Sequence, residues 1–375
     1  MNNKYLESPF EFLKRKDGTN FSPEIVRNWY KARAYVLDKL KEVSFGPDSG
    51  GYLHVMIPDD SALSLCLARQ VALCAHYINY DEVTGKNRTV ITIVSQNPDI
   101  LGVLEQEEWM GNLPKFCKSV VYGETSNADS FLDIELQVVR DPDDCTEKGY
   151  VEMTGDEAES FCKSVNYDKI DTRKAVFAHR IYDLGTLIFN IPYEDIHSVK
   201  RYSQALDSFQ YFQMERPWKP LVEAEKWKND LNRVRSGLSN IFCSDCFETR
   251  KREIDNKKQY DKDSADSREE VKRIDAVNYW EKYHDVLAGS EHLRWVVERL
   301  IMGHRPLNVQ ERIGIERTFG SQKKKYCNVL KRSTEDPAHI DLCSFAELRR
   351  VDPDNMKYDS FLMLAIPDIL KKVED

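Results

Sequence analysis

The first 140 residues alternate between apolar runs and amphipathic stretches. Apolar runs predict strands at 52–57, 88–94, 119–122 and 132–139, and the apolar positions of 62–77 recur at helical spacing. A strand that leads directly into a helix and then into a second strand is typical of a βαβ unit. The sequence therefore predicts an α/β domain with a parallel sheet, preceded by a helix over 23–42 that Ser22 would cap.

The later part of the chain is mainly helical in its pattern. Aromatic residues between 200 and 235 are irregularly spaced, and we expect them in core and interdomain contacts. Residues 249–273 are charged and nearly free of large apolar side chains, which predicts either a mobile connector or a solvated helix. We expect four parts, namely an N-terminal helical segment (1–48), an α/β domain (49–200), a helical connector (201–274) and a mainly α-helical domain (275–375).

The segment 291–307, which reads EHLRWVVERLIMGHRPL, gathers ionisable groups around one tryptophan. At 3.6 residues per turn, His292, Trp295 and Arg299 fall near one face of a helix. Arginine can bond a phosphate bidentately and tryptophan can stack, so this cationic, aromatic face suits a flat anionic ligand. The alternative is an amphipathic helix whose tryptophan lies in the core and whose Arg and Glu side chains pair at i,i+4.

Three blocks in the C-terminal part resemble the RyR domain, the repeat named after the ryanodine receptor that also occurs alone in bacterial and phage proteins. They are EHLRW at 291–295, HIDLC at 339–343, and KYD at 357–359 with IPDIL at 366–370. The chain departs from the family pattern at His304, where an aromatic residue is usual, and by an insertion over 308–325. The resemblance implies a mainly α-helical, RyR-like C-terminal domain.

Residues 62–82 and 88–94 resemble the first helix and second strand of Rossmann domains of the potassium-uptake regulator (TrkA-N) type. Proteins that join such a domain to a C-terminal RyR domain are known, and the order here is the same. The resemblance implies a Rossmann-like N-terminal domain. Bacterial relatives of the RyR domain have been linked by gene neighbourhood to nucleotide signalling and anti-phage defence, so the resemblance also implies a ligand sensor.

With this resemblance, we expect a ligand site that combines cations, aromatic rings and a carboxylate: His292, Arg294, Trp295, Arg299, Arg305, His339, Asp341, Lys357 and Tyr358. Arg294 and Arg299 would pair with phosphate. Trp295 would stack a base or pack the wall, and Asp341 would fix a ribose or an arginine. The structural alternative places Trp295 in the core and bonds His292 to a backbone carbonyl. The expected ligand is a small anionic nucleotide, either ADP-ribose-like or cyclic.

Conventional NAD binding is not expected. A dinucleotide-binding first turn needs glycines for the tight turn and for close approach of the pyrophosphate. Here that turn reads PDDSAL at 58–63, without a glycine, and Asp59 and Asp60 place negative charge where a diphosphate would lie. These two residues would instead cap the following helix. The α/β domain then serves as a scaffold, a dimerisation module or a site for a partner peptide.

Composition limits the partners. The formal net charge is −9 and no long Lys/Arg-rich stripe is present, which argues against a nucleic-acid polymer. No apolar run reaches membrane-spanning length and the N-terminus lacks a signal-peptide core. Nine scattered cysteines favour a reducing cytoplasm. Cys243 and Cys246 form one isolated C-x-x-C pair, for which two helix-facing thiols are expected, and Cys66 and Cys74 are expected in the core.

Support for catalysis is thin, because no G-x-S-x-G, H-E-x-x-H or Walker A motif is present. His76 and the polar residues after it would line a cleft or form an ordinary loop, and His179-Arg180 has no placed nucleophile beside it. We therefore favour a non-catalytic nucleotide sensor. The alternatives are a protein-interaction scaffold and a nucleotide-processing enzyme, and a protein partner or a homo-oligomer is compatible with the first two functions.

Overall fold

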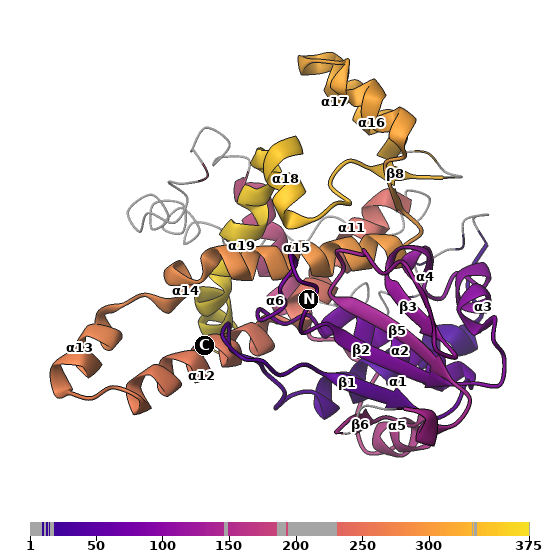
Figure 1. The fold of residues 1–375 in the computed structure, drawn as a ribbon, viewed down its shortest axis with the longest axis horizontal. Coiled ribbons are helices and arrows are strands. Elements are labelled where there is room, and N and C mark those ends of the chain that lie inside the picture. The colour runs from indigo at the N-terminus through magenta and orange to yellow at the C-terminus, as the bar shows by residue number, and fades with distance from the viewer. Residues whose placement is uncertain are drawn as a thin grey trace, which may run out of the picture.

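The apolar runs of the N-terminal half form one six-stranded sheet (Figure 1). The computed structural model describes residues 10, 13, 15, 19–145, 149–185, 193, 231–331, 333 and 336–374. The strands are β1 (His54–Ile57), β2 (Thr89–Val94), β3 (Lys118–Val121), β4 (Glu124–Ser126), β5 (Ile134–Val139) and β6 (Val151–Glu152). Their order is β4-β3-β5-β2-β1-β6, and all neighbours are parallel except β3 and β4.

Four of these strands lie in the predicted apolar runs, so the predicted parallel sheet of an α/β fold is confirmed. β1 and β2 are buried along almost their whole length, as is usual for parallel strands covered on both faces. Their register pairs Val55 with Ile91, and Ile91 pairs in turn with Leu136 of β5. β4, by contrast, is an exposed antiparallel edge strand whose three residues are all polar.

Two predicted helices flank this sheet. α1 (Pro23–Lys39) begins at the predicted cap, because the Ser22 side chain accepts a hydrogen bond from the backbone N–H of Ile25. α2 (Ala62–Cys74) follows β1 directly and is capped by Ser61, whose hydroxyl accepts from the N–H of Ser64. The shorter helices around the sheet are α3 (Ile100–Gln106), α4 (Leu113–Phe116), the 3-10 helix η2 (Pro142–Asp144) and α5 (Gly155–Cys162).

The C-terminal part is helical, as predicted. Its helices are α6 (Arg173–Gly185), α11 (Leu231–Asp245), α12 (Phe247–Asp263), α13 (Arg268–Ala276), α14 (Tyr279–Lys282), α15 (His284–Ile301), α16 (Val309–Glu316), α17 (Gly320–Lys331), α18 (Phe345–Val351) and α19 (Pro353–Glu374). The charged stretch 249–273 lies largely in α12 and α13; α13 is a solvated helix, whereas α12 buries Arg250, Glu253 and Ile254. The aromatic residues that we expected in core contacts between 200 and 235 lie outside the described residues.

The main hydrophobic core extends across the predicted domain boundary at 274/275. Val296 and Leu300 of α15 belong to the same cluster of buried residues as Val55 and Ile91 of the sheet. α15 packs on α2, which in turn packs on β1 and β2. A second cluster joins α6, α11, α12 and α19. The sheet and the C-terminal helices therefore share buried apolar surface, which stabilises their mutual arrangement.

A loop from the sheet side closes on the C-terminal end of α15. The backbone N–H of Asn112 donates to the carbonyl of Leu300 at 2.8 Å, and its side-chain amide donates to the carbonyls of Gly303 and His304 at 2.9 Å each. These hydrogen bonds satisfy backbone carbonyls at the C-terminal end of α15 and in the residues just after it. Gly111 before it has φ +51°, and a Cβ there would lie 2.3 Å from the carbonyl oxygen of Ile301. Only glycine allows the two backbones to approach this closely.

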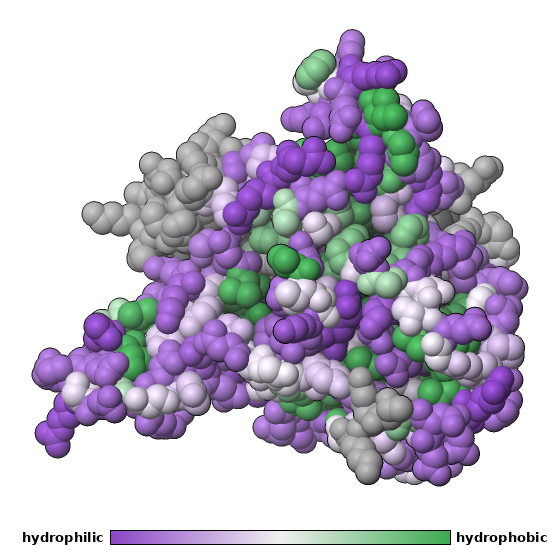
Figure 2. Space-filling model, viewed as in Figure 1, coloured by the Kyte–Doolittle hydropathy of each residue, from purple (hydrophilic) through white to green (hydrophobic). Residues whose placement is uncertain are grey.

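α16 and α17 project away from the rest of the molecule (Figure 1). They are joined to it by a short parallel pair, β7 (Arg305–Pro306) and β8 (Ala338–His339). The space-filling view shows green apolar side chains among purple polar ones along this projection (Figure 2). Val309, Phe319 and Val329 are 70%, 79% and 64% exposed there. Among the described helices, none combines the length and apolar character that crossing a membrane requires.

Candidate functional site

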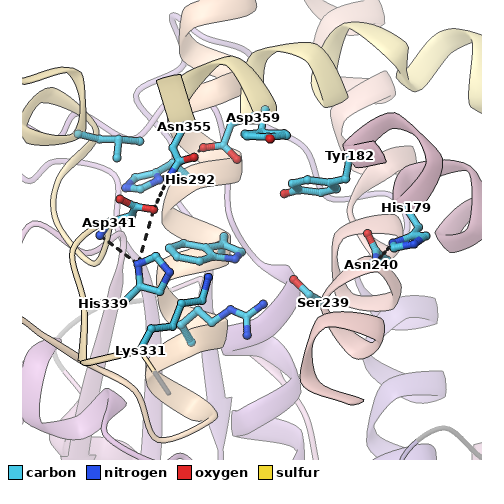
Figure 3. Close-up of a pocket in the computed structure, with 14 residues that line it drawn as sticks. His179, Tyr182, Ser239, Asn240, His292, Lys331, His339, Asp341, Asn355 and Asp359 are labelled. Atoms are coloured by element: carbon cyan, nitrogen blue, oxygen red, sulfur yellow. Dashed lines mark hydrogen bonds and ion pairs between the residues drawn. The ribbon is translucent and has the colours of Figure 1, made fainter. Parts of the chain in front are cut away.

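A cavity of about 330 Å³ lies between α6 and α11 on one side and α15, α19 and the β8 loop on the other. Six of the nine residues predicted for the ligand site line it, namely His292, Trp295, Arg299, His339, Asp341 and Tyr358. The lining is completed by His179, Tyr182, Ser239, Asn240, Lys331, Leu348, Asn355 and Asp359. In Figure 3, His292, His339, Asp341, Asn355 and Asp359 lie opposite His179, Tyr182, Ser239 and Asn240.

Three predicted residues form a ladder along one face of α15. His292, Trp295 and Arg299 follow each other at i, i+3 and i+7. The ring centroids of His292 and Trp295 are 6.1 Å apart, and the Arg299 guanidinium carbon lies 5.4 Å from the Trp295 centroid. His339 approaches the Trp295 ring edge-on at 5.1 Å. Trp295 therefore packs the cavity wall, which was one of its two predicted roles.

His292 is held by both of its ring nitrogens. Nε2 donates to the backbone carbonyl of Cys343 at 2.9 Å, as the structural alternative predicted, and Nδ1 lies 3.5 Å from Asp359 Oδ2. Burial alone would lower the pKa of His292, but the hydrogen bond and charge of Asp359 raise it above its ordinary value. The ring therefore adds positive character to the wall below neutral pH.

His339 and Asp341 contribute polar atoms that the described part of the chain leaves without hydrogen bonds. The backbone N–H of Asp341 donates to His339 Nδ1 at 3.2 Å, so a neutral ring carries its proton on Nε2. Neither His339 Nε2 nor Asp341 Oδ1 has a hydrogen-bond partner among the described residues, although the two residues are only 6% and 4% exposed. Buried polar atoms of native proteins are normally paired. These two atoms are therefore available to a ligand.

The electrostatics of this corner are cationic. Burial, followed by the positive charges of Lys331 and Arg299, holds the pKa of His339 well below its ordinary value. Burial and the nearby Asp352 raise the pKa of Asp341 to about 7. The Oδ2 atom of Asp341 accepts from the Asn355 side chain at 2.5 Å. A neutral His339 and a weakly acidic Asp341 therefore share the cavity lining with the cations Arg299 and Lys331.

The opposite wall was not predicted. Ser239 and Asn240 lie on α11, and His179 and Tyr182 lie on α6. The Tyr182 ring stacks on Tyr358 with centroids 5.6 Å apart. His179 stood out in the sequence only as an isolated His-Arg pair, and nothing in the sequence relates α6 or α11 to α15. Asp359, in contrast, belongs to the KYD block and could have been selected with its neighbour Tyr358.

Arg294, which was predicted to pair with phosphate, lies outside the cavity lining. Its side chain is fully buried, and its Nε and Nη2 donate to Glu291 at 2.8–2.9 Å while Nη1 donates to Glu298 at 2.8 Å. Arg294 lies one residue, or about 100° of helical rotation, before Trp295, and its guanidinium is held by two glutamates of the same helix, outside the cavity lining. This is the internal Arg–Glu pairing that the structural alternative described.

Two further predicted residues also lie outside the cavity lining. Arg305 on β7 donates to Glu311 at 2.7 and 2.8 Å and to Asp336 at 2.7 Å, so it clamps the base of the α16–α17 projection. Lys357 pairs with Asp354 at 2.6 Å within α19. Both cations therefore bind carboxylates of the chain, away from the residues that line the cavity.

In the turn between β1 and α2, the carboxylates of Asp59 and Asp60 accept hydrogen bonds from nearby backbone and hydroxyl groups. Asp59 accepts from the backbone N–H of Ser61 and from the Ser64 hydroxyl, each at 2.9 Å, and Asp60 accepts from the Ser95 hydroxyl at 2.5 Å. Burial would raise the pKa of Asp59, but these hydrogen bonds hold it below its ordinary value. The helix cap is Ser61, not either aspartate as predicted. The turn therefore carries negative charge at the carboxyl-terminal end of β1.

Other candidate side chains are structural. His76 is buried, with Nδ1 2.8 Å from Asp133 and Nε2 2.8 Å from the carbonyl of Ala72. Cys243 and Cys246 are buried, and burial raises the pKa of both thiols. Cys66 and Cys74 lie in the core, as predicted. Within the described ranges, no group of three or more His, Cys, Asp or Glu side chains is placed to hold a metal ion.

The cavity brings together groups that can bind a ligand. It offers a donor at His339, an acceptor at Asp341, cations at Arg299 and Lys331, and an aromatic wall at Tyr358. Sites for small molecules typically combine a largely apolar lining with a few convergent polar groups of this kind. Comparison with protein-family models, curated proteins and solved structures found no match to this chain.

Proposed function

We propose that this protein binds a small anionic, nucleotide-type ligand in the cavity and acts as a sensor or adaptor without catalysing a reaction. In this proposal the sheet belongs to a Rossmann-like domain and the C-terminal helices to an RyR-like domain. The observation that carries it is the pair of buried polar atoms, His339 Nε2 and Asp341 Oδ1, beside Arg299 and Lys331. A nucleotide supplies both the hydroxyls and the phosphate that such groups bind.

The three blocks that resemble the RyR domain support this assignment because each contributes to the cavity. EHLRW supplies His292 and Trp295, HIDLC supplies His339 and Asp341, and KYD supplies Tyr358 and Asp359. These blocks are separated by tens of residues in the sequence. Their meeting around one cavity is expected if the family pattern is maintained for ligand binding.

Small molecules released from the denatured protein can be identified by mass spectrometry, and binding can be measured by titration calorimetry. The panel contains AMP, ADP-ribose, NAD, and cyclic di- and trinucleotides. Arg299→Gln should weaken binding roughly ten- to hundred-fold, since a hydrogen bond to a charged group is worth about 1.5–3 kcal/mol. Arg317→Gln is the control, because Arg317 is exposed at the end of α16. No released nucleotide and no heat of binding across the panel would refute the sensor proposal.

One observation favours protein binding as a second function. The α16–α17 projection carries the exposed side chains of Val309, Phe319 and Val329, with six Lys or Arg residues against two Glu over 309–331. Exposed bulky side chains ringed by charge are typical of partner-binding surfaces. If this is the main function, Phe319→Ser should abolish assembly with a partner while Arg299→Gln leaves assembly intact.

A further inference from the structure

We propose that the ligand is a ribose phosphate of mononucleotide size, whose vicinal hydroxyls bind Asp341 and His339 and whose phosphate binds Arg299 and Lys331. This inference rests on the proposed function, because it assigns the ligand of the same cavity. It goes further by stating which end of the ligand each wall holds and by excluding larger nucleotides. Three features of the cavity support it: its volume, the polar pair of His339 Nε2 and Asp341 Oδ1, and the cations Arg299 and Lys331.

The size of the cavity sets the size of the ligand. Small-molecule sites occupy about 300–1,000 Å³. At about 330 Å³ this cavity is near the lower limit. A dinucleotide such as NAD, or a cyclic trinucleotide, contains two or three times the bulk of a mononucleotide. A single nucleotide or a sugar phosphate therefore matches the volume of this open cavity better than either.

The polar pair matches a diol better than a phosphate. His339 Nε2 is a donor, and Asp341 Oδ1 is an acceptor that comes from the same loop two residues later. A hydroxyl donates and accepts at once, so two adjacent hydroxyls can satisfy both atoms. A phosphate would bond to the histidine but would bring its charge against the Asp341 carboxyl. Acidic side chains hold ribose hydroxyls in this way in dinucleotide-binding proteins.

The cations then mark the phosphate end. Arg299 lies on the cavity ladder of α15, and its Nε forms no hydrogen bond within the described part of the chain; its nearest acidic atom, Glu298 Oε1, is 3.7 Å away. Lys331, at the end of α17, lines the same cavity and lies beside His339 in Figure 3. Arg299 and Lys331 also keep His339 neutral. In this arrangement Arg299 and Lys331 would bind the phosphate of the ligand. His339 and Asp341 would bind its sugar.

Calorimetric titration of the full-length protein tests this inference with AMP, ribose 5-phosphate, 2′,3′-dideoxy-AMP, 3′,5′-cyclic AMP, ADP-ribose and NAD. We expect AMP to bind at least tenfold more tightly than dideoxy-AMP, because loss of the diol leaves buried polar atoms unpaired. We expect ribose 5-phosphate to bind measurably. Cyclic AMP, which lacks a free 3′-hydroxyl, should resemble the dideoxy compound, and neither ADP-ribose nor NAD should exceed AMP.

The matched variant is Asp341→Asn, with Asp368→Asn on the exposed surface of α19 as control. In Asp341→Asn the affinity ratio of AMP to dideoxy-AMP should fall toward one, whereas Asp368→Asn should retain the full ratio. Thermal unfolding of both variants verifies that they fold. A wild-type ratio near one, or an unchanged ratio in Asp341→Asn, would overturn the diol assignment while nucleotide binding itself persists. Tighter binding of NAD or ADP-ribose would overturn the size assignment. Absence of binding by every compound would overturn this inference, and the proposed function would fail with it only if cyclic di- and trinucleotides also showed no binding.

Discussion

Ser239 on α11 donates a hydrogen bond to Glu298 on α15, with the two side-chain oxygens 2.8 Å apart and both residues buried. Glu298 also accepts from Arg294, which in turn binds Glu291. This buried chain of polar contacts joins two helices that form opposite walls of the cavity. Such a network stabilises a unique arrangement only while every member keeps its partners.

Arg294→Met should therefore lower the free energy of unfolding by about 3–5 kcal/mol, since it leaves two buried carboxylates without their cation. Arg299→Met should lower it by less, about 1–2 kcal/mol, because that guanidinium packs on Trp295 and its ion pair with Glu298 is long, at 3.7 Å. Urea denaturation followed by circular dichroism measures both values. Equal, small losses in the two variants would show that the buried network contributes little.

The close contact between Gly111 and the end of α15 predicts that one added methyl group at this position strongly lowers the stability of the protein. Gly111→Ala combines a positive φ with a Cβ only 2.3 Å from a backbone oxygen, so the loop must move. Gly123→Ala is a matched control, because Gly123 also has a positive φ but open space around its Cβ. We expect a loss of about 1–2 kcal/mol for Gly123→Ala and about 1–3 kcal/mol more for Gly111→Ala. Chemical denaturation of both variants is the measurement, and similar losses would argue against the close approach.

The raised pKa of Asp341 predicts a pH-dependent stability. Its pKa rises from the ordinary value of 3.8 to about 7 in the folded protein, mainly because of burial. A carboxyl of this kind favours folding when it is protonated, so its contribution is fully present below pH 4 and is lost as the pH rises to about 7. The slope is at most about 1.4 kcal/mol per pH unit.

Asp341→Asn removes that titration. The variant should gain stability relative to the wild type as the pH rises from 4 to 7, and the difference should then stay level above pH 7. Glu253, whose pKa is also raised to about 7 by burial, titrates in both proteins and cancels in the comparison. Thermal unfolding at a series of pH values gives the difference. A difference that does not change with pH would contradict the raised pKa.

The burial of the cysteines predicts an order of reactivity. Seven of the nine cysteines are buried, and Cys145 and Cys327 are partly exposed. The thiolate is the reacting form, and burial raises the pKa of Cys327 as well as those of Cys243 and Cys246. In the native protein, iodoacetamide should therefore label Cys145 first, Cys327 next, and the others only after unfolding. Rapid labelling of Cys243 and Cys246, detected by peptide mass spectrometry, would instead indicate a reactive pair.

Local patterns were sufficient to predict the sheet and its first helices. The strands β1 and β2 lie in continuous apolar runs, and the helical periodicity of α2 begins a few residues after the first strand. These features depend on residues that are neighbours in the sequence, and periodicity reports them directly. The helical nature of 249–273, which the charge pattern left open, was decided by the pairing of α12 and α13 and their contacts.

The choice among the cationic residues of 291–305 required the tertiary structure. Arg294 and Arg299 lie on one helix and look alike in the sequence, but one is an internal ion-pair residue and the other lines a cavity. α15 is buried on nearly all sides, so its charge pattern does not distinguish a core face from a ligand face. The partner helices α6 and α11 make that distinction, and their positions depend on packing between segments distant in the sequence.

The sequence by itself thus determined the α/β architecture, the helical C-terminal part, and six residues that meet in one cavity. Only the tertiary structure decided that Arg294, Arg305 and Lys357 are paired within the protein, and that Lys331, Tyr182 and Asn240 complete the wall. The physical reason is that secondary structure follows local apolar periodicity. Whether a buried charge meets a carboxylate or a cavity depends instead on which distant helix faces it.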